Sequence, residues 1–216
     1  MGDLELKFLG KDSGFGNKNN SAYIELDDKL ILIDCGFTVF EEIKKRFDLN
    51  KYKTFEIIIT HLHNDHAGSL SQVILYSWFK FNKKVYVYSK CKRIQEYLDI
   101  TGTPKEAYEL KDKSKNLEFI KTEHTKYLDA YGFTLEINGK KIVYTGDTNK
   151  LESFDVYLDK CDEFYVDVSK NGGAHLKFDN IIDRLLVLKN NGIKICLMHL
   201  DDKEYIKEKN NNNFYI

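Results

Sequence analysis

The sequence predicts an α/β fold in which a β-sandwich is covered by helices. Short apolar runs rich in β-branched residues alternate with stretches whose apolar residues recur at helical spacing, and the scheme occurs twice along the 216 residues. Such elements bury their apolar faces by stacking in layers. Because single α/β units commonly reach this length, we expect one domain spanning residues 1–216.

The first half begins as a β-meander and continues with helices. A loop rich in glycine and asparagine at 14–20 follows the first strand, and the Asp27-Asp28 turn joins the next two. The strands expected in this half lie at 4–9, 22–26, 30–33, 55–60 and 85–88, and the helices lie at 39–47, 70–81 and near 93–98. A further helix start is expected at Thr103, with Pro104 in the first turn and Glu106 closing a capping box.

The second half repeats the arrangement of strands followed by a helix. The Asn138-Gly139 pair predicts a hairpin turn between two apolar runs. The expected strands lie at 117–121, 133–137, 141–144 and 193–197, and an amphipathic helix lies at 181–188. Residues 210–216, which open with a run of asparagines, are expected to form a frayed tail.

The charge balance favours a small ligand over a long polyanion. The 33 basic and 34 acidic residues give a net charge of −1, so nothing favours electrostatic capture of a long nucleic acid. Four cysteines are scattered without a C-x-x-C pair, and we expect reduced, buried thiols. The first residues lack a basic, apolar leader and no run of 18 apolar residues occurs, so we expect a cytoplasmic protein that does not enter a membrane.

Three of the six histidines fall within one hexapeptide, residues 61–66, directly after an expected strand. Because strand side chains alternate, His61 and His63 project to the same side, and Asp65 and His66 follow on the turn. Two imidazoles suit one divalent ion, and the carboxylate with the third imidazole suits a second. A purely structural role would leave these groups buried without partners, at a cost of roughly several kcal/mol. The hexapeptide therefore favours a two-metal site.

Residues 60–68, Thr-His-Leu-His-Asn-Asp-His-Ala-Gly, resemble the signature of the metallo-β-lactamase superfamily. Glu-His at 123–124, Tyr-Thr-Gly-Asp-Thr at 144–148 and Cys-Leu-Met-His at 196–199 match its later motifs in order and context. Judged without the family, His124 and His199 are equally well explained as isolated histidines at strand ends. The resemblance implies that one ion is bound by His61, His63 and His124, the other by Asp65, His66 and His199, and both by Asp147.

The resemblance also implies a four-layer αββα sandwich and hydrolytic chemistry. Two divalent ions, about 3.5–4 Å apart, would hold a bridging hydroxide that attacks the substrate, with Asp65 counted among the catalytic residues. Mixed histidine and aspartate ligands favour Zn²⁺, and the hard oxygen donors also tolerate Mn²⁺. His63 stands where the oxygen-reducing di-iron branch carries an acidic residue, which argues against redox chemistry.

Two segments resemble the ribonuclease Z-like phosphodiesterases of the superfamily. Phe-Leu-Gly at 8–10, followed by Ser-Gly-Phe-Gly at 13–16, is similar to their amino-terminal loop, although a simple turn explains it equally well. His175 stands where this branch carries a general acid, and the alternative is a histidine at a helix start that faces water. The branch usually has glutamate at the position of Asp167, so the resemblance gives weak support to Asp167 as the residue that orients His175.

Two further features have a functional and a structural interpretation. Asp34 resembles the carboxylate that orients a metal-bound histidine, and a turn-capping aspartate is the alternative. Aromatic residues of the second helix and the following strand could stack on a nucleobase, but this spacing is more typical of core packing. They are Tyr76, Trp78, Phe79, Phe81, Tyr86 and Tyr88.

The leading hypothesis is a dinuclear phosphodiesterase that acts on a small or cyclic nucleotide, with His175 protonating the leaving oxygen. Ribonuclease Z itself inserts a long tRNA-gripping arm between the equivalents of His124 and Asp147, where this sequence has room only for a hairpin. Small cyclic-nucleotide phosphodiesterases of the branch, including those that phages use against nucleotide-signalling defences, lack the arm. Their resemblance also implies a homodimer.

Two other classes remain as alternatives. A glyoxalase II-like hydrolase of thioesters or lactones would use the same hydroxide without His175, but those enzymes carry a helical region after the last histidine, and only 17 residues follow His199. A metal-stabilised scaffold without turnover would be expected to lose ligands, and all seven are present.

Overall fold

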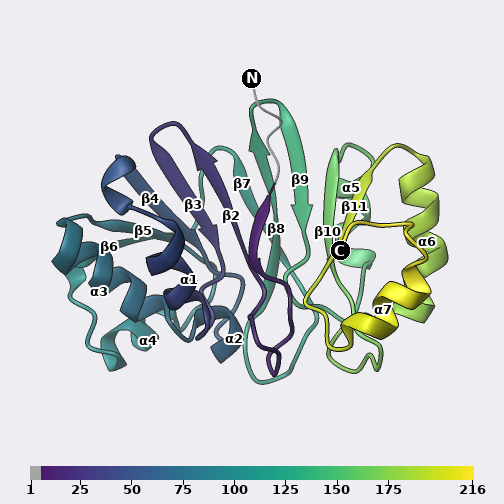
Figure 1. Cartoon of the computed structure of the whole chain (residues 1–216), viewed down its shortest axis with the longest axis horizontal. Helices are drawn as coiled ribbons and strands as arrows, with labels where there is room; N and C mark the ends of the chain where they lie inside the picture. Colours follow the sequence, from purple (N-terminus) through teal and green to yellow (C-terminus); the bar gives the residue numbers. More distant parts are fainter. Residues whose placement is uncertain (1–5) are drawn as a thin grey trace. The chain divides into compact units, whose positions relative to one another are not determined.

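The computed structural model of the chain describes residues 6–216, so the first two residues of the strand expected at 4–9 lie outside the described residues. Contacts within the chain gather into two compact units, the first ending at Lys113 and the second spanning Ser114–Ile216. Each unit is built on one sheet with helices packed against it (Figure 1). The expectation of a single domain stays a prediction.

The sheet of the first unit has six strands in sequence order. The first two pairings are antiparallel and the last three are parallel. The strands are β1 (Lys7–Gly10), β2 (Ser21–Leu26), β3 (Lys29–Ile33), β4 (Thr54–Ile58), β5 (Val85–Tyr88) and β6 (Tyr108–Lys111). Leu32, Ile33 and Ile57 are completely buried, as expected for strands covered on both faces.

Four helices and two 3₁₀ turns accompany this sheet. They are α1 (Val39–Arg46), η1 (Leu49–Lys51), α2 (Asn64–Ala67), α3 (Leu70–Phe81), α4 (Ile94–Ile100) and η2 (Lys105–Ala107). The helix start expected at Thr103 is only the 3₁₀ turn η2, because Pro104 keeps an extended ψ of 134°. The Thr103 hydroxyl bonds to that of Ser71, 2.7 Å away, instead of capping a helix.

The sheet of the second unit has five strands in the order β11-β10-β9-β8-β7. The strands are β7 (Leu117–Lys121), β8 (Tyr131–Ile137), β9 (Lys140–Tyr144), β10 (Glu163–Asp167) and β11 (Lys194–Met198), and the helices are η3 (Glu152–Phe154), α5 (Asp155–Leu158), α6 (Phe178–Asn190) and α7 (Lys203–Asn210). Strands β9, β10 and β11 are parallel, so their carboxyl ends meet at one edge. Phe154, Phe164 and Phe178 are completely buried in the core of this unit.

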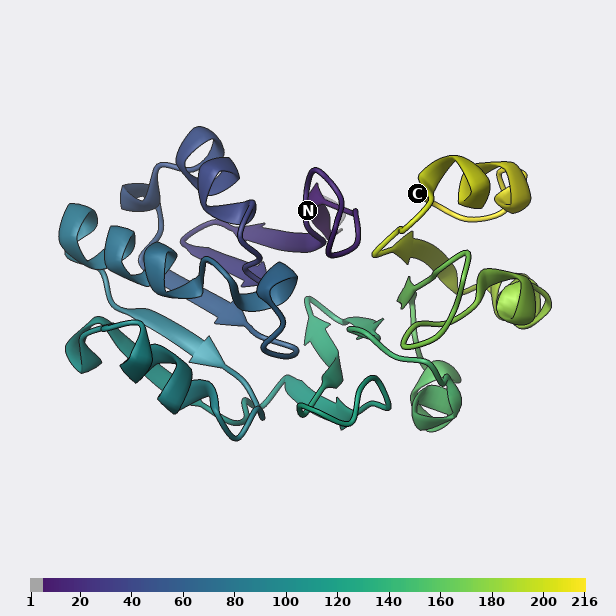
Figure 2. The ribbon, with the colours of Figure 1, turned by 90° about the horizontal axis from the view of Figure 1, so that it is seen from below.

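The carboxyl-terminal residues are anchored, and the expected frayed tail does not occur in this structure. The Asn210 side chain is buried and exchanges two hydrogen bonds of 2.8 Å with the backbone of Phe214. Tyr215 then pairs with Cys196, so the tail lies along the outer edge of β11 (Figure 2). The asparagine run is the reason why fraying is expected, but its first residue, Asn210, supplies the side chain that holds the tail in place.

Two expectations drawn from composition can be compared with the structure. All four cysteines are buried, and none forms a disulfide. Among residues 6–216, none of the helices combines the length and the apolar character that crossing a bilayer requires.

Candidate metal centre

Each unit carries one half of the predicted metal site beyond the carboxyl ends of its strands. In the first unit, β4 ends at Ile58 and the hexapeptide follows, so that His61 and His63 lie in the turn and Asp65 and His66 lie on α2. His61 and His66 are buried, whereas His63 and Asp65 are half-buried. The ligands therefore lie between the core and the surface, where bound ions would reach substrate.

The predicted ligands of the first unit form two pairs, and in each pair the two donor atoms lie close together. Nε2 of His61 lies 3.0 Å from Nδ1 of His63, and Nε2 of His66 lies 3.3 Å from Oδ2 of Asp65. Two ligands held about 2.0–2.1 Å from a tetrahedral ion lie roughly 3.3 Å from each other. The Asp65–His66 pair therefore has the spacing of two ligands of one ion, whereas the His61–His63 pair lies at hydrogen-bond distance.

Asp34 fixes the orientation of His66. Its carboxylate lies 2.8 Å from Nδ1 of His66 and accepts a 2.9 Å hydrogen bond from the Thr60 amide. Burial raises the pKa of Asp34, and the neighbouring His66 and Thr60 counteract part of that rise. With Nδ1 directed to Asp34, Nε2 of His66 is the nitrogen that can bind an ion. The geometry agrees with the orienting role rather than with a simple turn cap.

The second unit contributes His124, Asp147 and His199, which follow β7, β9 and β11 respectively. Their side chains are at most 3 % exposed. Oδ2 of Asp147 lies 3.6 Å from Nε2 of His124 and 3.5 Å from Nε2 of His199. These separations exceed a hydrogen bond and are close to the spacing of ligands around a common ion. A carboxylate between two imidazoles is the arrangement that a bridging ligand needs.

His124 is oriented by the backbone of the segment that carries His175. Its Nδ1 lies 2.9 Å from the carbonyl oxygen of Ala174, which can only accept a hydrogen bond. The proton of neutral His124 therefore belongs on Nδ1, and the Nε2 lone pair is left to bind an ion.

His175 is held by Asp167, the carboxylate at the end of β10. Nδ1 of His175 lies 2.8 Å from Oδ2 of Asp167, which is completely buried. Burial lowers the pKa of His175, but the charge and hydrogen bond of Asp167 raise it by more, so the net shift is upward. The resemblance gave only weak support to Asp167, but in the structure its carboxylate does contact His175. The shorter aspartate reaches the histidine because β10 ends directly beside it.

A second set of hydrogen bonds shapes the loop that precedes His175. Ser169 donates to Asp201 at 2.6 Å, and the Lys170 amide donates to the other oxygen of Asp201 at 2.9 Å. Ser169 also accepts hydrogen bonds from the amides of Asn171 and Gly172. Sequence reasoning missed this network, because no motif links residues so far apart in the chain.

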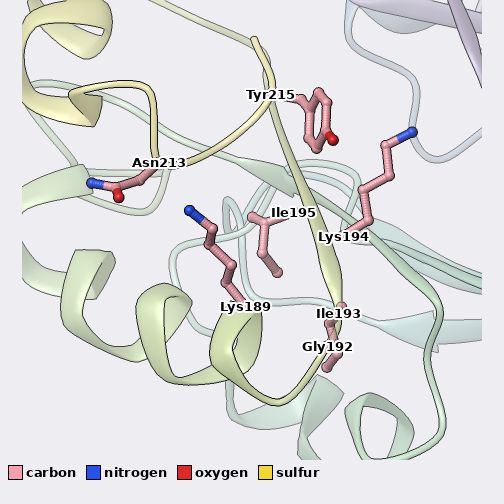
Figure 3. A pocket seen from close by; sticks show the side chains of 7 residues that line it. All are labelled: Lys189, Gly192, Ile193, Lys194, Ile195, Asn213 and Tyr215. Atoms are coloured by element: carbon pink, nitrogen blue, oxygen red, sulfur yellow. The ribbon is translucent and has the colours of Figure 1, made fainter.

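The predicted site residues thus form two local groups. His61, His63, Asp65 and His66 lie together in the first unit, and His124, Asp147, His175 and His199 lie together in the second. Their assembly into one centre remains a prediction. A separate pocket of about 250 Å³ in the second unit is lined by Lys189, Lys194 and five neighbours (Figure 3), and none of these is a predicted ligand.

Comparison of the backbone with solved structures establishes the class of fold. The metallo-β-lactamase fold protein YhfI of Bacillus subtilis matches with a TM-score of 0.78 at 17 % identity, covering 98 % of this chain and 93 % of that one. The short form of human tRNase Z matches with a TM-score of 0.68 at 16 % identity, covering 92 % and 93 %. The chain has the metallo-β-lactamase fold, as predicted.

Within this class, sequence comparison identifies more particular relatives. A family model described as anti-Pycsar protein Apyc1 matches residues 4–99. The anti-Pycsar protein Apyc1 of Bacillus phage 010DV004 is 25 % identical, with 92 % of this chain and 90 % of the relative covered. The similarity to that phage protein therefore extends over both units, whereas the family model matches only the first.

Proposed function

We propose that the chain is a dinuclear metal-dependent hydrolase that cleaves a phosphodiester in a small or cyclic nucleotide. The observation that carries the proposal is the His175–Asp167 pair, which lies beside the donor atoms of Asp147 and His199. A departing alkoxide needs a proton, and general acids typically speed such steps by about 10²–10⁴-fold. A thiolate leaving group needs no such help.

In this proposal the two half-sites bind two ions together. His61, His63 and His124 hold one ion, Asp65, His66 and His199 hold the other, and Asp147 is shared. Zn²⁺ suits this mixed set best, and Mn²⁺ is tolerated by the carboxylates. When bound, the ions supply Lewis acidity and a hydroxide nucleophile at neutral pH.

The side chains around the ions have distinct tasks. His175 gives its proton to the leaving oxygen, and Asp167 holds the imidazole in place through Nδ1 and raises its pKa. Asp34 and the Ala174 carbonyl hold Nδ1 of His66 and of His124, so that Nε2 of each imidazole would be the atom that binds an ion. These groups are in place before substrate binds, which reduces the reorganisation that the reaction requires.

A small substrate agrees with the segment between His124 and Asp147. The principal elements of that segment are the hairpin strands β8 and β9. No element of its described residues resembles the long arm expected of a tRNA-processing enzyme. The relatedness to an anti-Pycsar protein over most of its length also favours the small-nucleotide branch.

The test is a steady-state assay of purified, metal-loaded protein on a cyclic nucleotide, a thioester and a lactone, with metal content measured in the same preparations. We expect hydrolysis of the cyclic nucleotide and no comparable hydrolysis of the thioester or the lactone. Rapid cleavage of the thioester or lactone alone would transfer the assignment to the acyl hydrolases.

We also propose a cytoplasmic homodimer, on the strength of the resemblance to small cyclic-nucleotide phosphodiesterases. Sedimentation equilibrium of the full chain checks the association state, and a species of single-chain mass at micromolar concentration would contradict it.

A further inference from the structure

In the first unit, two segments that each contain a Gly-Phe pair approach Asp65, one of the proposed metal ligands, through their glycines. A β-carbon on Gly14 would lie 3.0 Å from Oδ2 of Asp65, and one on Gly36 would lie 2.0 Å from its carbonyl oxygen. Each glycine thus allows its segment to approach Asp65 closely. Each is followed directly by a phenylalanine, Phe15 or Phe37.

The two phenylalanines are unusually exposed for apolar side chains beside a polar site. Phe15 is 107 % exposed and Phe37 is 53 % exposed. Burying a phenylalanine side chain stabilises a folded protein, so neither of these side chains contributes its full share to the stability of the fold. Exposed aromatic faces beside a binding site mark a place where a ligand can be stacked.

Reciprocal hydrogen bonds tie the two segments together. The Asn19 amide donates to the Thr38 hydroxyl at 2.9 Å, and the Thr38 amide donates to the Asn19 side chain at 3.1 Å. The ammonium group of Lys18 also lies 3.2 Å from Glu42 on α1. Phe15 and Phe37 are therefore carried by two braced segments, which lowers the entropy cost of holding a ligand between or against them.

The other aromatic residues considered for stacking are placed differently. Tyr76 packs edge-on against Phe40 and Phe81, with ring centroids 5.4 Å and 5.2 Å away. Trp78, Phe81 and Tyr86 are half-buried and Tyr88 is buried. Phe79 is 74 % exposed, but it lies near the end of α3.

We propose that Phe15 and Phe37 form an aromatic platform for the base of the nucleotide whose phosphodiester is cleaved at the metal centre. The inference rests on the proposed function and deepens it, since it assigns the base, rather than the phosphate, to these two side chains. Stacking on aromatic rings tolerates any base, because every base has a π-face. The platform therefore selects nucleotides over other phosphodiesters without selecting one base strongly.

The kinetic test compares a 3′,5′-cyclic nucleotide with the corresponding base-free cyclic ribose phosphate. Alanine in place of an aromatic stacking residue costs roughly 5- to 150-fold in binding per base. We expect Phe15→Ala and Phe37→Ala each to raise KM for the cyclic nucleotide within that range and to change KM for the base-free substrate far less. Phe79→Ala is the matched control, because Phe79 is exposed to an extent between those of Phe15 and Phe37 and lies outside the platform.

A binding measurement separates this inference from the proposed catalytic function. Calorimetric titration of the metal-loaded protein with a nucleoside 5′-monophosphate and with ribose 5-phosphate reports the contribution of the base without turnover. A preference for the nucleotide that falls in both platform variants supports the inference even if neither phosphodiester is hydrolysed. Equal affinities for the two ligands in the wild-type protein would overturn it. Loss of a dimer in both variants, with the nucleotide preference unchanged, would assign the phenylalanines to a contact between copies instead.

Discussion

Asp147 and Asp167 show how two buried carboxylates acquire different roles from their neighbours. Asp147 faces the Nε2 atoms of two histidines at distances too long for hydrogen bonds, whereas Asp167 makes a short contact with Nδ1 of His175. The first arrangement suits an ion between the groups, and the second suits a proton. The same type of side chain is therefore suited to binding a metal at position 147 and to positioning the proposed acid at position 167.

Replacing Asp147 tests the shared ligand directly. Asp147→Ala should reduce turnover on any substrate by at least about 10³-fold and lower the metal content, because the two ions lose the group that keeps them at working distance. Activity and elemental analysis of the same preparation provide the measurement. Activity within tenfold of wild type, with full metal content, would show that Asp147 is not the bridging ligand.

Replacing His175 tests the proton donor. His175→Ala should slow hydrolysis of an unactivated nucleotide phosphodiester by about 10²–10⁴-fold. An aryl phosphodiester should be affected much less, because its leaving group departs as a stable anion. Asp167→Asn should show the same dependence on leaving group to a smaller extent, since the imidazole remains. Equal losses on both substrates, at unchanged metal content, would return His175 to the role of an ordinary histidine near a helix start.

At the scale of elements, sequence patterns predicted strands and helices well where the pattern was apolar and continuous. Expected strands at 30–33 and 117–121 and the helix at 70–81 match β3, β7 and α3 closely. Strand β10 was not predicted, because its apolar centre is short and bounded by Glu163 and Asp167, both of which are buried. Glu163 and Asp167 therefore masked the strand in the sequence, although Asp167, at its end, is the residue that contacts His175.

Helix α1 and the amino-terminal loop are joined through Glu42. Its carboxylate lies 3.2 Å from the Lys18 ammonium group and 3.0 Å from Nε of Arg46. Burial raises the pKa of Glu42, but its two basic partners lower it by more, so the net pKa lies below the usual 4.5. Ionised Glu42 therefore stabilises the folded state above pH 4.5, and this contribution is lost as the pH falls through the lowered pKa.

Glu42→Gln should consequently reduce the free energy of unfolding at pH 7 by about 0.5–1 kcal/mol, a value that allows for solvent screening. The difference from wild type should shrink as the pH is lowered well below the usual carboxyl range. Urea denaturation at both pH values measures it, with the exposed Glu41→Gln as control. A difference that is the same at both pH values would exclude the ion pairs as its source.

For the whole molecule, the fold class was predicted correctly from sequence. The hexapeptide pointed to four of the seven proposed ligands by its own residues, whereas His124, Asp147 and His199 were proposed only through the resemblance to the superfamily. The contact between Asp34 and His66 was expected from the resemblance, but the hydrogen bond that orients His124 was not. The contact of the Ala174 carbonyl with His124 and the Ser169–Asp201 hydrogen bond both depend on loop conformations that the sequence pattern does not reveal. The anchored tail was missed for a similar reason, because Asn210 acts through the backbone of Phe214.

The metal content of the intact chain is the corresponding prediction. Protein purified without chelator should contain close to two divalent ions per chain, because seven ligands exceed what one tetrahedral ion uses. Removal of the ions should lower the Tm, and Zn²⁺ or Mn²⁺ should restore it, since ligands that bind only the folded state stabilise it. A stoichiometry fixed at one ion in the presence of excess metal would contradict the dinuclear centre.

The different sequence origins of the two half-sites have a consequence for how the protein folds. Four ligands of the first unit come from one hexapeptide, so a single turn after β4 brings them together. His124, Asp147 and His199 follow three different strands, and their approach requires those strands to have found their places in the sheet. Contacts between distant residues form late because each must first overcome the entropy of closing a long loop. The first group can therefore form locally, whereas His124, Asp147 and His199 come together only when the second sheet is complete.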